Sequence, residues 1–410
     1  MTWPVVVVGL LLLVFLHELG HFTVALAVGM RPRSFYVGFP PAVVKVKRRG
    51  ITFALGAIPL GGYVRIPGVQ RPAAGDVTVL TANALREDPS LSGPVQRLRR
   101  ALDADDYTTA REELPELARA IEGASLSAGA RRSAERAVRE IDEGTGPDAY
   151  WRQSTWRRVA MFAAGPAMNV LVAFVLFYIV FATGAPTSTP NAVVADVRKG
   201  TPAATAGLKR DDRIVAVSGR PASSFDAISS RIRASRGKPI TVTVVRRGHR
   251  LTLGPQRTIP SGQGYYIWGF SPGYTSVSHS PTASARLAAR ENWRVFTGTI
   301  SAFAGLLHSK ERQQVSGPVG IVRQSEVALH LGINYYLEIL GLISMSLAIF
   351  NMLPLLPLDG GHILFSIIEG VRRRALAREV YERVSVAGLM LIGLIWIIAI
   401  SNDLGSNAPR

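Results

Sequence analysis

The stretch VFLHELGHF, Val14 to Phe22, sets a glutamate between two histidines inside an apolar run from Pro4 to Gly29. Such a run is long enough to cross the ~30 Å hydrocarbon core of a bilayer as a helix. Ionisable side chains are costly in a membrane span and are usually functional there. On a helix His17 and His21 share one face, with Glu18 beside them. Two imidazole nitrogens can therefore converge on one zinc ion while the carboxylate reaches a water molecule on the metal.

Three further uncharged runs are long enough to span a bilayer, namely Val159 to Thr183, Ile339 to Leu358 and Val384 to Asn402. The 410-residue chain is 48% hydrophobic, which also favours a membrane protein. The first run lacks preceding basic residues and a small-residue cleavage site, so we expect a retained helix and not a removed signal peptide. We predict a polytopic α-helical membrane protein with four transmembrane helices.

The net charge of +18 does not indicate nucleic-acid binding, because the basic residues gather at particular ends of the apolar runs. Lys and Arg follow the first run, precede the second, and lie between the third and the fourth. Residues 184–197 and 324–336, which flank the opposite ends, contain neither. Positive residues near helix ends mark the cytoplasmic side. We therefore predict both termini outside, residues 30–158 and 370–383 inside, and residues 184–335 outside.

Two regions on the predicted inner side differ in composition. Residues 31–68 alternate β-branched residues with Gly and Pro, and Val43 to Lys47 and Ile51 to Leu55 read as strands joined by a turn at Arg49-Gly50. We expect a membrane-associated β-hairpin region, with an ordinary surface hairpin as the alternative.

Residues 69–150 are rich in Ala, Arg and Glu, and helical spacing recurs over residues 93–104, 108–122 and 128–143. This pattern predicts a cytosolic helical insertion, unless it is a solvated linker without a partner.

Residues 191–270 contain GTPA, AGL and DDRI between Gly200 and Ile214, and they resemble an extracytoplasmic PDZ (α+β) domain. The spacing predicts a helix over 224–235 and strands over 240–245 and 250–253. A PDZ groove grips an extended peptide by β-augmentation, although a PDZ-shaped spacer without a ligand is also consistent with the pattern. An amphipathic helix over 284–307 would lie on the outer membrane surface or dock against a domain.

A zinc site on the first run requires a third protein ligand. The chain has no cysteine, so this ligand must be His or a carboxylate. The third run ends in NMLPLLPLDGGHI, which offers Asp359 and His362. His21 lies ten residues and Asp359 thirteen residues before the nearest inner basic cluster. At ~1.5 Å per helical residue, both lie ~15–20 Å from those charges. Asp359 is the favoured third ligand, with His362 and Glu369 as alternatives.

Two prolines, Pro354 and Pro357, interrupt the same segment, which a membrane tolerates only where protein or a water cavity satisfies the freed backbone groups. Asn351 lies just upstream and can hydrogen-bond a substrate backbone or a developing oxyanion. Asn169 lies among small residues in AAGPAMNV, a pattern that favours close helix packing over catalysis.

HELGH in the first run, the PDZ-like module, SGPVGI at Ser316 to Ile321 and NMLPLLPLDGG together resemble the site-2 protease family of M50 type. The likeness is to its bacterial branch of regulated intramembrane proteolysis with a single PDZ domain, and residues 69–150 fall outside it. The resemblance implies that His17, His21 and Asp359 bind zinc and that Glu18 is the general acid and base. It places Asn351 and Pro354 in the substrate-binding segment. The second proline is displaced by one position from the usual family pattern, which affects backbone contacts and not the ligand.

The predicted function is that of an intramembrane zinc metalloprotease in the bacterial inner membrane. The resemblance implies single-pass substrates such as anti-sigma factors or remnant signal peptides, and the hairpin edge would supply hydrogen bonds to an unwound substrate. The alternative is a non-catalytic PDZ-bearing membrane adaptor of the same fold. A zinc permease is disfavoured, because one ligand cluster and no inverted repeat are visible. The predicted regions are 1–30, 31–68, 69–150, 157–183, 191–270, 280–330, 334–369 (third helix with LDG) and 384–402.

Overall fold

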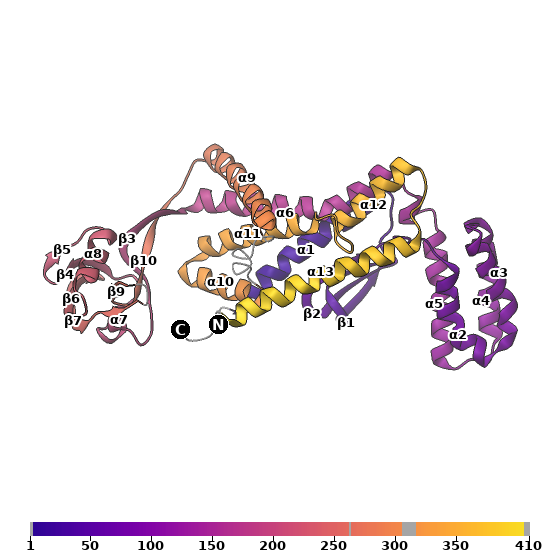
Figure 1. Ribbon diagram of the computed structural model, residues 1–410, viewed down its shortest axis with the longest axis horizontal. Coiled ribbons are helices and arrows are strands. Elements are labelled where there is room, and N and C mark those ends of the chain that lie inside the picture. Colours follow the sequence, from indigo (N-terminus) through magenta and orange to yellow (C-terminus); the bar gives the residue numbers. More distant parts are fainter. Residues whose placement is uncertain (1–2, 262–263, 306–316, 406–410) are drawn as a thin grey trace. The chain divides into compact units, whose positions relative to one another are not determined.

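The computed structural model describes residues 3–261, 264–305 and 317–405 (Figure 1). Four helices in this part of the chain are long and apolar enough to cross a membrane. They are α1 (Trp3–Ala27), α6 (Thr155–Thr183), α11 (Ile333–Asn351) and α13 (Arg378–Gly405). The prediction of four candidate spans is thereby confirmed.

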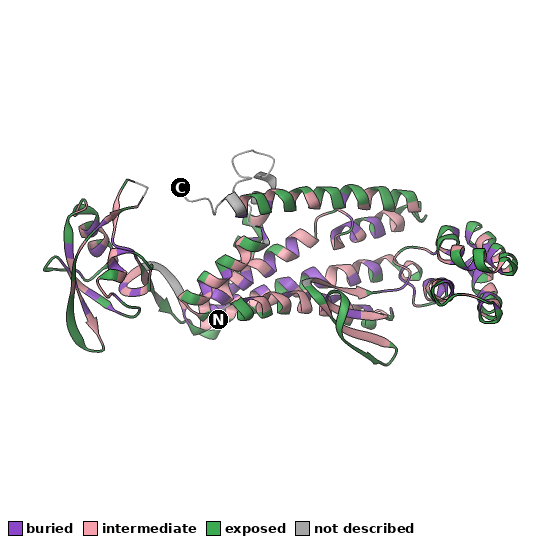
Figure 2. Cartoon of the chain, turned by 90° about the horizontal axis from the view of Figure 1, so that it is seen from below, coloured by how far each residue is buried: buried purple, intermediate pink, exposed green. Residues whose placement is uncertain are grey.

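Helix α13 leaves large apolar side chains uncovered along most of its length (Figure 2). Leu389, Met390 and Ile397 are each more than 60% exposed. A protein in water rarely exposes so long an apolar face, whereas lipid tails cover it without cost. The exposed face of α13 is therefore consistent with a bilayer around it.

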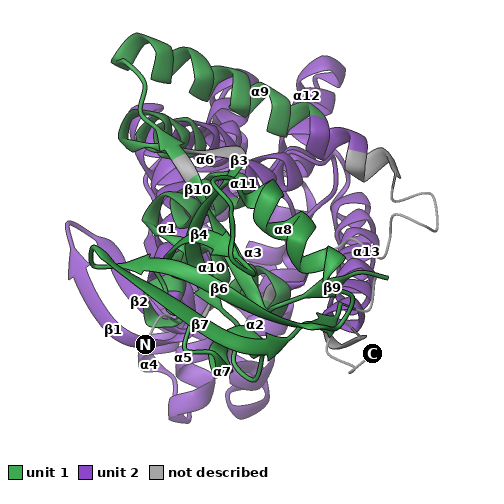
Figure 3. Ribbon diagram, turned by 90° about the vertical axis from the view of Figure 1, so that its left-hand side faces the viewer, with its two compact units in different colours: residues 1–6, 173–297, 318–343 green, residues 7–172, 298–317, 344–410 purple. Residues whose placement is uncertain are grey.

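The chain forms two compact units that interleave along the sequence (Figure 3). Unit 1 comprises Met1–Val6, Ala173–Thr297 and Pro318–Ile343. Unit 2 comprises Val7–Val172, Gly298–Gly317 and Ser344–Arg410. The sequence motifs HELGH and LDG both fall in unit 2, so the candidate site can be described within one unit.

The third predicted span, 334–369, is not one helix, and this expectation was wrong. Helix α11 ends at Asn351, residues 352–358 are not helical, and α12 (Asp359–Arg372) starts anew. Pro354 and Pro357 fall inside the break. A proline lacks the backbone N–H and its ring clashes with the preceding turn, so two of them in four residues end the helix.

Glycines allow the broken segment to pack closely. A Cβ atom on Gly360 would lie 2.2 Å from the carbonyl oxygen of Met352, and one on Gly388 of α13 would lie 1.8 Å from that of Leu356. No larger residue fits at either position without movement of the backbone. These contacts fix where α12 begins, and hence where Asp359 lies.

The predicted hairpin is confirmed, with β1 (Ser34–Arg48) and β2 (Ile51–Arg65) antiparallel around the turn at Arg49-Gly50. Both turn residues have positive φ, as a tight two-residue hairpin turn requires. The strands are longer than predicted and fold back, so residues 34–37 pair with 52–55 on one side and with 62–65 on the other. Residues 62–65 thus form an edge of the sheet.

A helical bundle of four α-helices occupies residues 74–145 of unit 2. Its helices are α2 (Ala74–Glu87), α3 (Ser92–Asp103), α4 (Tyr107–Gly123) and α5 (Ala128–Thr145), with short 3-10 turns at Pro89–Leu91 (η1) and, after the bundle, Tyr150–Arg152 (η2). Buried apolar side chains such as Val77, Leu98 and Leu117 give the bundle its own core. The three predicted helices are confirmed, whereas α2 was not predicted.

The sheet domain of unit 1, residues 185–277, consists of a six-stranded antiparallel sheet with short helices. Along the sheet the order is β10 (Phe270–Val277), β3 (Ala185–Val197), β4 (Arg213–Val217), β6 (Pro239–Arg246) and β7 (His249–Arg257), with β5 (Arg220–Pro221) paired to β4. The remaining elements are α7 (Pro202–Thr205), α8 (Phe225–Ala234), β8 (Ile259–Pro260) and β9 (Tyr266–Ile267). The predicted helix over 224–235 and both predicted strands are present.

Two helices follow the sheet domain, α9 (Pro281–Gly305) and α10 (Pro318–Leu331). The predicted helix over 284–307 is confirmed as far as Gly305, whereas residues 306 and 307 lie outside the described residues. Ser316, the first residue of SGPVGI, also lies outside them, and α10 was not predicted. Trp293 on α9 is 67% exposed. Whether α9 rests on a membrane surface stays a prediction.

Candidate active site

Three side chains from two distant segments converge in unit 2. His17 and His21 lie four residues apart on α1, and their Nε2 atoms are 3.2 Å from each other. Asp359, the first residue of α12, places Oδ2 3.4 Å from His17 Nε2 and 3.3 Å from His21 Nε2. The ligand atoms of all three lie within 4.8 Å of one another, and both histidines are buried. The group therefore has the composition and spacing of a metal site.

Helix α6 lies against this cluster because two glycines let the helices approach. A Cβ atom on Gly165 would lie 2.2 Å from His21 Nε2 and 2.7 Å from His17 Cε1. On α1, a Cβ atom on Gly20 would lie 2.5 Å from the carbonyl oxygen of Ala164. The two imidazole rings thus occupy the space that any side chain at position 165 would need.

The outer nitrogens of both imidazole rings have partners on α6. His21 Nδ1 lies 2.8 Å from the carbonyl oxygen of Met161, which can only accept, so Nδ1 carries the proton. His17 Nδ1 lies 3.0 Å from the side-chain amide of Asn169, which is completely buried. Ser344 Oγ of α11 donates to the backbone oxygen of Asn169 at 2.8 Å. Each Nε2 therefore remains turned toward the other members of the cluster.

Sequence reasoning assigned Asn169 to helix packing and missed its contact with His17. Its backbone does join α6 to α11, but its side chain reaches the cluster. Gly165 and Asn169 lie four residues apart on α6, as His17 and His21 do on α1. That shared spacing puts each pair on one helix face, and it was the signal available in the sequence.

A cavity of about 450 Å³ opens beside the cluster. Glu18, Asn351 and His362 line it together with the three cluster residues. Pro354, which the sequence analysis placed in the substrate-binding segment, is not among the lining residues, whereas Pro357 is. Glu18 is buried, and the backbone of Val64 is hydrogen-bonded to its carboxylate. The cavity thus brings together five of the six predicted site residues.

The edge strand of the hairpin forms one wall of this cavity. Gly62, Tyr63 and Val64 line it, and a Cβ atom on Gly62 would lie 2.9 Å from Glu18 Cγ. Residues 62–65 pair with residues 34–37 on one side only, and no described strand pairs with their other side. Apart from the Val64 group that is hydrogen-bonded to Glu18, this side of the edge has no partner strand among the described residues and can take an extended peptide.

The two alternative ligands make other contacts. The His362 ring stacks on Phe162, with centroids 4.3 Å apart and planes 4° from parallel. Glu369 accepts a hydrogen bond from Arg158 Nη1 at 2.6 Å. Among the described residues, the metal-type group consists of His17, His21 and Asp359 alone.

The three converging atoms fit a zinc ion. Bonds of ~2.0–2.1 Å in a tetrahedron imply ~3.3–3.4 Å between neighbouring ligand atoms, and the observed separations are 3.2, 3.4 and 3.3 Å. Asp359 Oδ2 is buried without a hydrogen-bond partner among the described residues, although two imidazole nitrogens face it. Two imidazoles and one carboxylate are a known catalytic zinc set with a fourth position open for water.

Comparison with known proteins agrees with this chemistry. The sequence pattern of peptidase family M50 matches residues 5–395. The chain belongs to peptidase family M50. It is 29% identical to the zinc metalloprotease RasP of Geobacillus kaustophilus, over 96% of this chain and 95% of that protein. It is 30% identical to a protein of Agrobacterium fabrum, over 96% of this chain and 93% of that one, whose name assigns it provisionally to the zinc metalloproteases.

Membership in M50, the site-2 protease family, makes the protein a zinc metalloendopeptidase that uses Zn²⁺. With four candidate membrane spans, this M50 member is a membrane protease. The predicted family, enzyme class and cofactor are thereby confirmed.

Proposed function

We propose that this M50 protease holds its zinc ion through His17, His21 and Asp359 and uses Glu18 as general acid and base. The convergence of three ligand atoms within 4.8 Å, from α1 and from the start of α12, carries the proposal. Glu18 supports it, because the carboxylate lines the same cavity next to the two histidines. A non-catalytic adaptor or a permease has no need of a base at that position.

Each proposed group has a defined task. His17, His21 and Asp359 would hold the zinc ion, which would supply Lewis acidity to activate water. The Glu18 carboxylate would accept a proton from the attacking water molecule and later deliver it to the nitrogen of the leaving amine. The cavity of about 450 Å³ gives water and the peptide a place beside Glu18. The buried surroundings strengthen the interactions among these charged groups.

Asn169 has a positioning role in this account. His17 can offer the Nε2 lone pair only if Nδ1 carries the proton, so Nδ1 needs an acceptor. The Asn169 Oδ1 atom is buried and has no hydrogen-bond partner among the described residues, while Nδ2 faces His17. Oxygen and nitrogen of an amide are interchangeable in shape. Turning this amide by 180° lets Oδ1 accept from His17 Nδ1 and fixes the required tautomer.

The proposed substrate is a transmembrane segment of a single-pass membrane protein, as the family resemblance implies for anti-sigma factors or remnant signal peptides. A helical segment hides its carbonyl groups in its own hydrogen bonds and must unwind before cleavage. Residues 62–65 offer an unpaired strand edge beside Glu18, which favours binding of the unwound segment by β-augmentation. Asn351 lines the same cavity and supplies a further hydrogen-bonding group for the peptide backbone.

The placement in the membrane follows from the charge pattern. Lys and Arg cluster between the first and second spans and between the third and fourth, which favours the inner membrane with both termini extracytoplasmic. In this orientation residues 69–150 are cytosolic and the sheet domain is extracytoplasmic. The domain's antiparallel sheet and the helix α8 are compatible with a PDZ domain that admits an extended peptide.

Replacement of Glu18 by Gln tests the proposed base. The full chain is reconstituted in lipid with a single-span substrate, and zinc per protein and the cleavage rate are both measured. We expect Glu18→Gln to keep its zinc and to lose at least ~10²-fold in rate, because an amide cannot accept the proton. Glu112→Gln, on the exposed surface of α4, should match the wild type. Normal cleavage by Glu18→Gln would exclude this assignment.

A further inference from the structure

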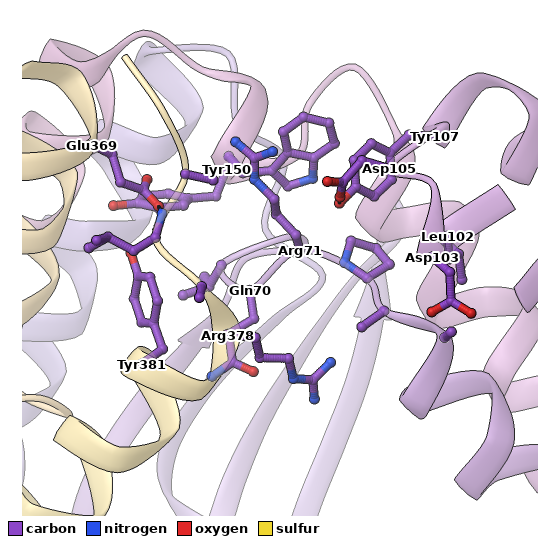
Figure 4. Close-up of a pocket in the computed structure, with 18 of the residues that line it drawn as sticks. Gln70, Arg71, Leu102, Asp103, Asp105, Tyr107, Tyr150, Glu369, Arg378 and Tyr381 are labelled. Atoms are coloured by element: carbon purple, nitrogen blue, oxygen red, sulfur yellow. Dashed lines mark hydrogen bonds between the residues drawn. The ribbon is translucent and has the colours of Figure 1, made fainter. Parts of the chain in front are cut away.

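A second cavity, of about 390 Å³, lies within unit 2 where the helical bundle joins the membrane helices (Figure 4). Leu102, Asp103, Asp105 and Tyr107 of the bundle form one wall. Tyr150, Arg158, Glu369 and Tyr381, from η2, α6, α12 and α13, form the other. Arg71, from the connection between β2 and α2, lies between the two walls in Figure 4. None of these residues belongs to the candidate active site.

Arg71 brings a positive charge into this cavity without a carboxylate partner. No Asp or Glu lies within ion-pair distance of Arg71 in the described part of the chain. Its guanidinium lies instead 4.7 Å from the centroid of the Trp151 ring, and Arg152 lies 4.8 Å from the same ring. Trp151 is held by a hydrogen bond from Nε1 to the Gly144 carbonyl oxygen at 2.8 Å. Arg71 is thus positioned by this stacking and by a hydrogen bond with the Tyr107 side chain, while no carboxylate compensates its charge.

Arg158 adds unused hydrogen-bond donors to the same cavity. Only 7% of this residue is exposed, and its one hydrogen bond to a described residue runs from Nη1 to Glu369. Its Nε atom is buried without a partner. Arg378, by contrast, donates two hydrogen bonds to Asp76, at 2.7 and 2.8 Å. Glu369 compensates the charge of Arg158, but a buried donor without a partner is costly, so the Arg71 charge and the free Nε–H of Arg158 together favour an anionic ligand.

The opposite wall is acidic, which limits the kind of anion. Asp103 and Asp105 face the cavity, and Asp105 accepts only one hydrogen bond from a described side chain, that of Tyr107 at 2.9 Å. Like charges close together repel, so a simple polyanion does not suit this wall. A zwitterion with its anionic group toward the arginines and an ammonium group toward the aspartates suits both walls.

The surroundings of the cavity are those of a membrane interface. Trp156, in the first turn of α6, is 63% exposed, and Arg157 stacks near its ring. Residues 372–374, at the C-terminal end of α12, are three consecutive arginines. Exposed tryptophan and arginine at the ends of spans mark the level of lipid headgroups, and basic pockets between spans at this level bind such headgroups.

We propose that this cavity binds a phosphoethanolamine group, with the phosphate against Arg71 and Arg158 and the ammonium against Asp103 and Asp105. The group can come from phosphatidylethanolamine of the surrounding leaflet or from a soluble glycerophosphoethanolamine. A ligand in this position bridges the helical bundle and the helices that carry the active site.

The proposal is tested by native mass spectrometry of the delipidated full chain in detergent. The probes are phosphatidylethanolamine, phosphatidylglycerol, phosphatidylcholine and soluble glycerophosphoethanolamine. We expect one tightly bound phosphatidylethanolamine per chain and at least ~10-fold weaker binding by Arg71→Gln, with partial recovery in Arg71→Lys. The control Arg132→Gln, on the exposed face of α5, should bind as the wild type does. Zinc content shows that each variant is folded.

The aspartate variants test recognition of the ammonium group, and the soluble probe tests whether the ligand comes from a lipid or from solution. Asp103→Asn/Asp105→Asn should keep binding of phosphatidylglycerol and lose the preference for phosphatidylethanolamine. Arg71-dependent binding of glycerophosphoethanolamine as tight as that of the lipid would identify a soluble source of the same group. Equal binding by Arg71→Gln and Arg132→Gln overturns the proposal, and so does a wild type that does not prefer phosphatidylethanolamine to the other lipids.

Discussion

The helical bundle and the zinc cluster of unit 2 are built on opposite principles. The bundle buries many ordinary apolar side chains, among them Leu98, Leu117 and Ala134, and leaves its charged side chains at least partly exposed. The cluster instead brings the buried His17 and His21 and the half-buried Asp359 together, and close contacts at Gly20 and Gly165 hold the surrounding helices in place. Stability of the bundle is therefore spread over many replaceable contacts, whereas the cluster depends on a few positions that admit no change.

Ion pairs on the protein surface join the bundle and the segment after it to the hairpin region and to α13. Arg33 pairs with Asp148 at 2.9 Å, Arg65 with Glu143 at 3.0 Å, and Arg378 with Asp76 at 2.7 Å. These side chains are partly exposed, and such ion pairs contribute ~0–1 kcal/mol each. These ion pairs therefore add little to the stability of the rest of unit 2, and the cluster should tolerate their loss.

The largest effect is expected from a single methyl group at Gly165. The Cβ atom of Gly165→Ala would fall 2.2 Å from His21 Nε2, so the ring or the whole of α6 must move. Such overpacking costs ~1–3 kcal/mol and displaces a proposed ligand. We expect zinc per protein and cleavage to fall together, by ~10-fold or more, as is usual when the support of a metal ligand is lost.

The matched change in the bundle is Gly129→Ala on α5. A Cβ atom at Gly129 meets nothing within 4 Å, and the residue is exposed. Because alanine favours a helix, hydrogen exchange of α5 in the full chain should slow by the equivalent of at most ~1 kcal/mol, with zinc and cleavage unchanged. If both glycine variants behaved alike, the contrast between the two regions would be wrong.

A smaller effect on zinc is expected when the bundle is removed. Gly144 lies against Pro72, where a Cβ atom would be 2.6 Å from the proline ring, so the ends of the bundle are adjacent. Replacing residues 74–143 by a short Gly-Ser linker should therefore keep the zinc content within ~20% of the wild type, since the contacts that are lost, weak surface ion pairs and the packing of Tyr107 on Trp151, lie outside the zinc cluster. Zinc per protein on a monodisperse truncated chain is the measurement. A truncated chain that keeps its helical content and loses its metal would show that the bundle helps build the site.

Much of this architecture can be predicted from sequence because local patterns determine it. The four spans follow from apolar length, the turn at Arg49-Gly50 from its residue types, and three helices of the bundle from their spacing. His17 and His21 can be recognised as functional residues from sequence, because ionisable side chains inside a membrane span are costly and are usually functional. The convergence with Asp359 was predicted from equal depth in the membrane and from the family resemblance, not from local pattern.

What was missed depends on contacts between segments. The interruption of the third span was expected from Pro354 and Pro357, but the close packing of Leu356 on Gly388 of α13 is a contact that no periodicity reveals. In the sequence, Asn169 resembles an ordinary packing position among small residues, and only the packing of α6 against α1 shows its contact with His17. Helix α2 was missed because three of its four buried positions, Ala74, Thr81 and Ala84, carry small or polar residues, so its apolar face is hard to recognise in the sequence.

The central claim is that Asp359 is the third zinc ligand, and Asp359→Asn tests it most directly. The substitution keeps the shape and replaces an anionic oxygen by a neutral amide, a poor zinc ligand. The measurement is zinc per protein after dialysis against a weak chelator, run beside His362→Ala and Glu369→Gln. We predict that Asp359→Asn alone loses zinc and cleavage while all three variants stay folded. One zinc and normal cleavage in Asp359→Asn, with both lost in His362→Ala or Glu369→Gln, would contradict the claim.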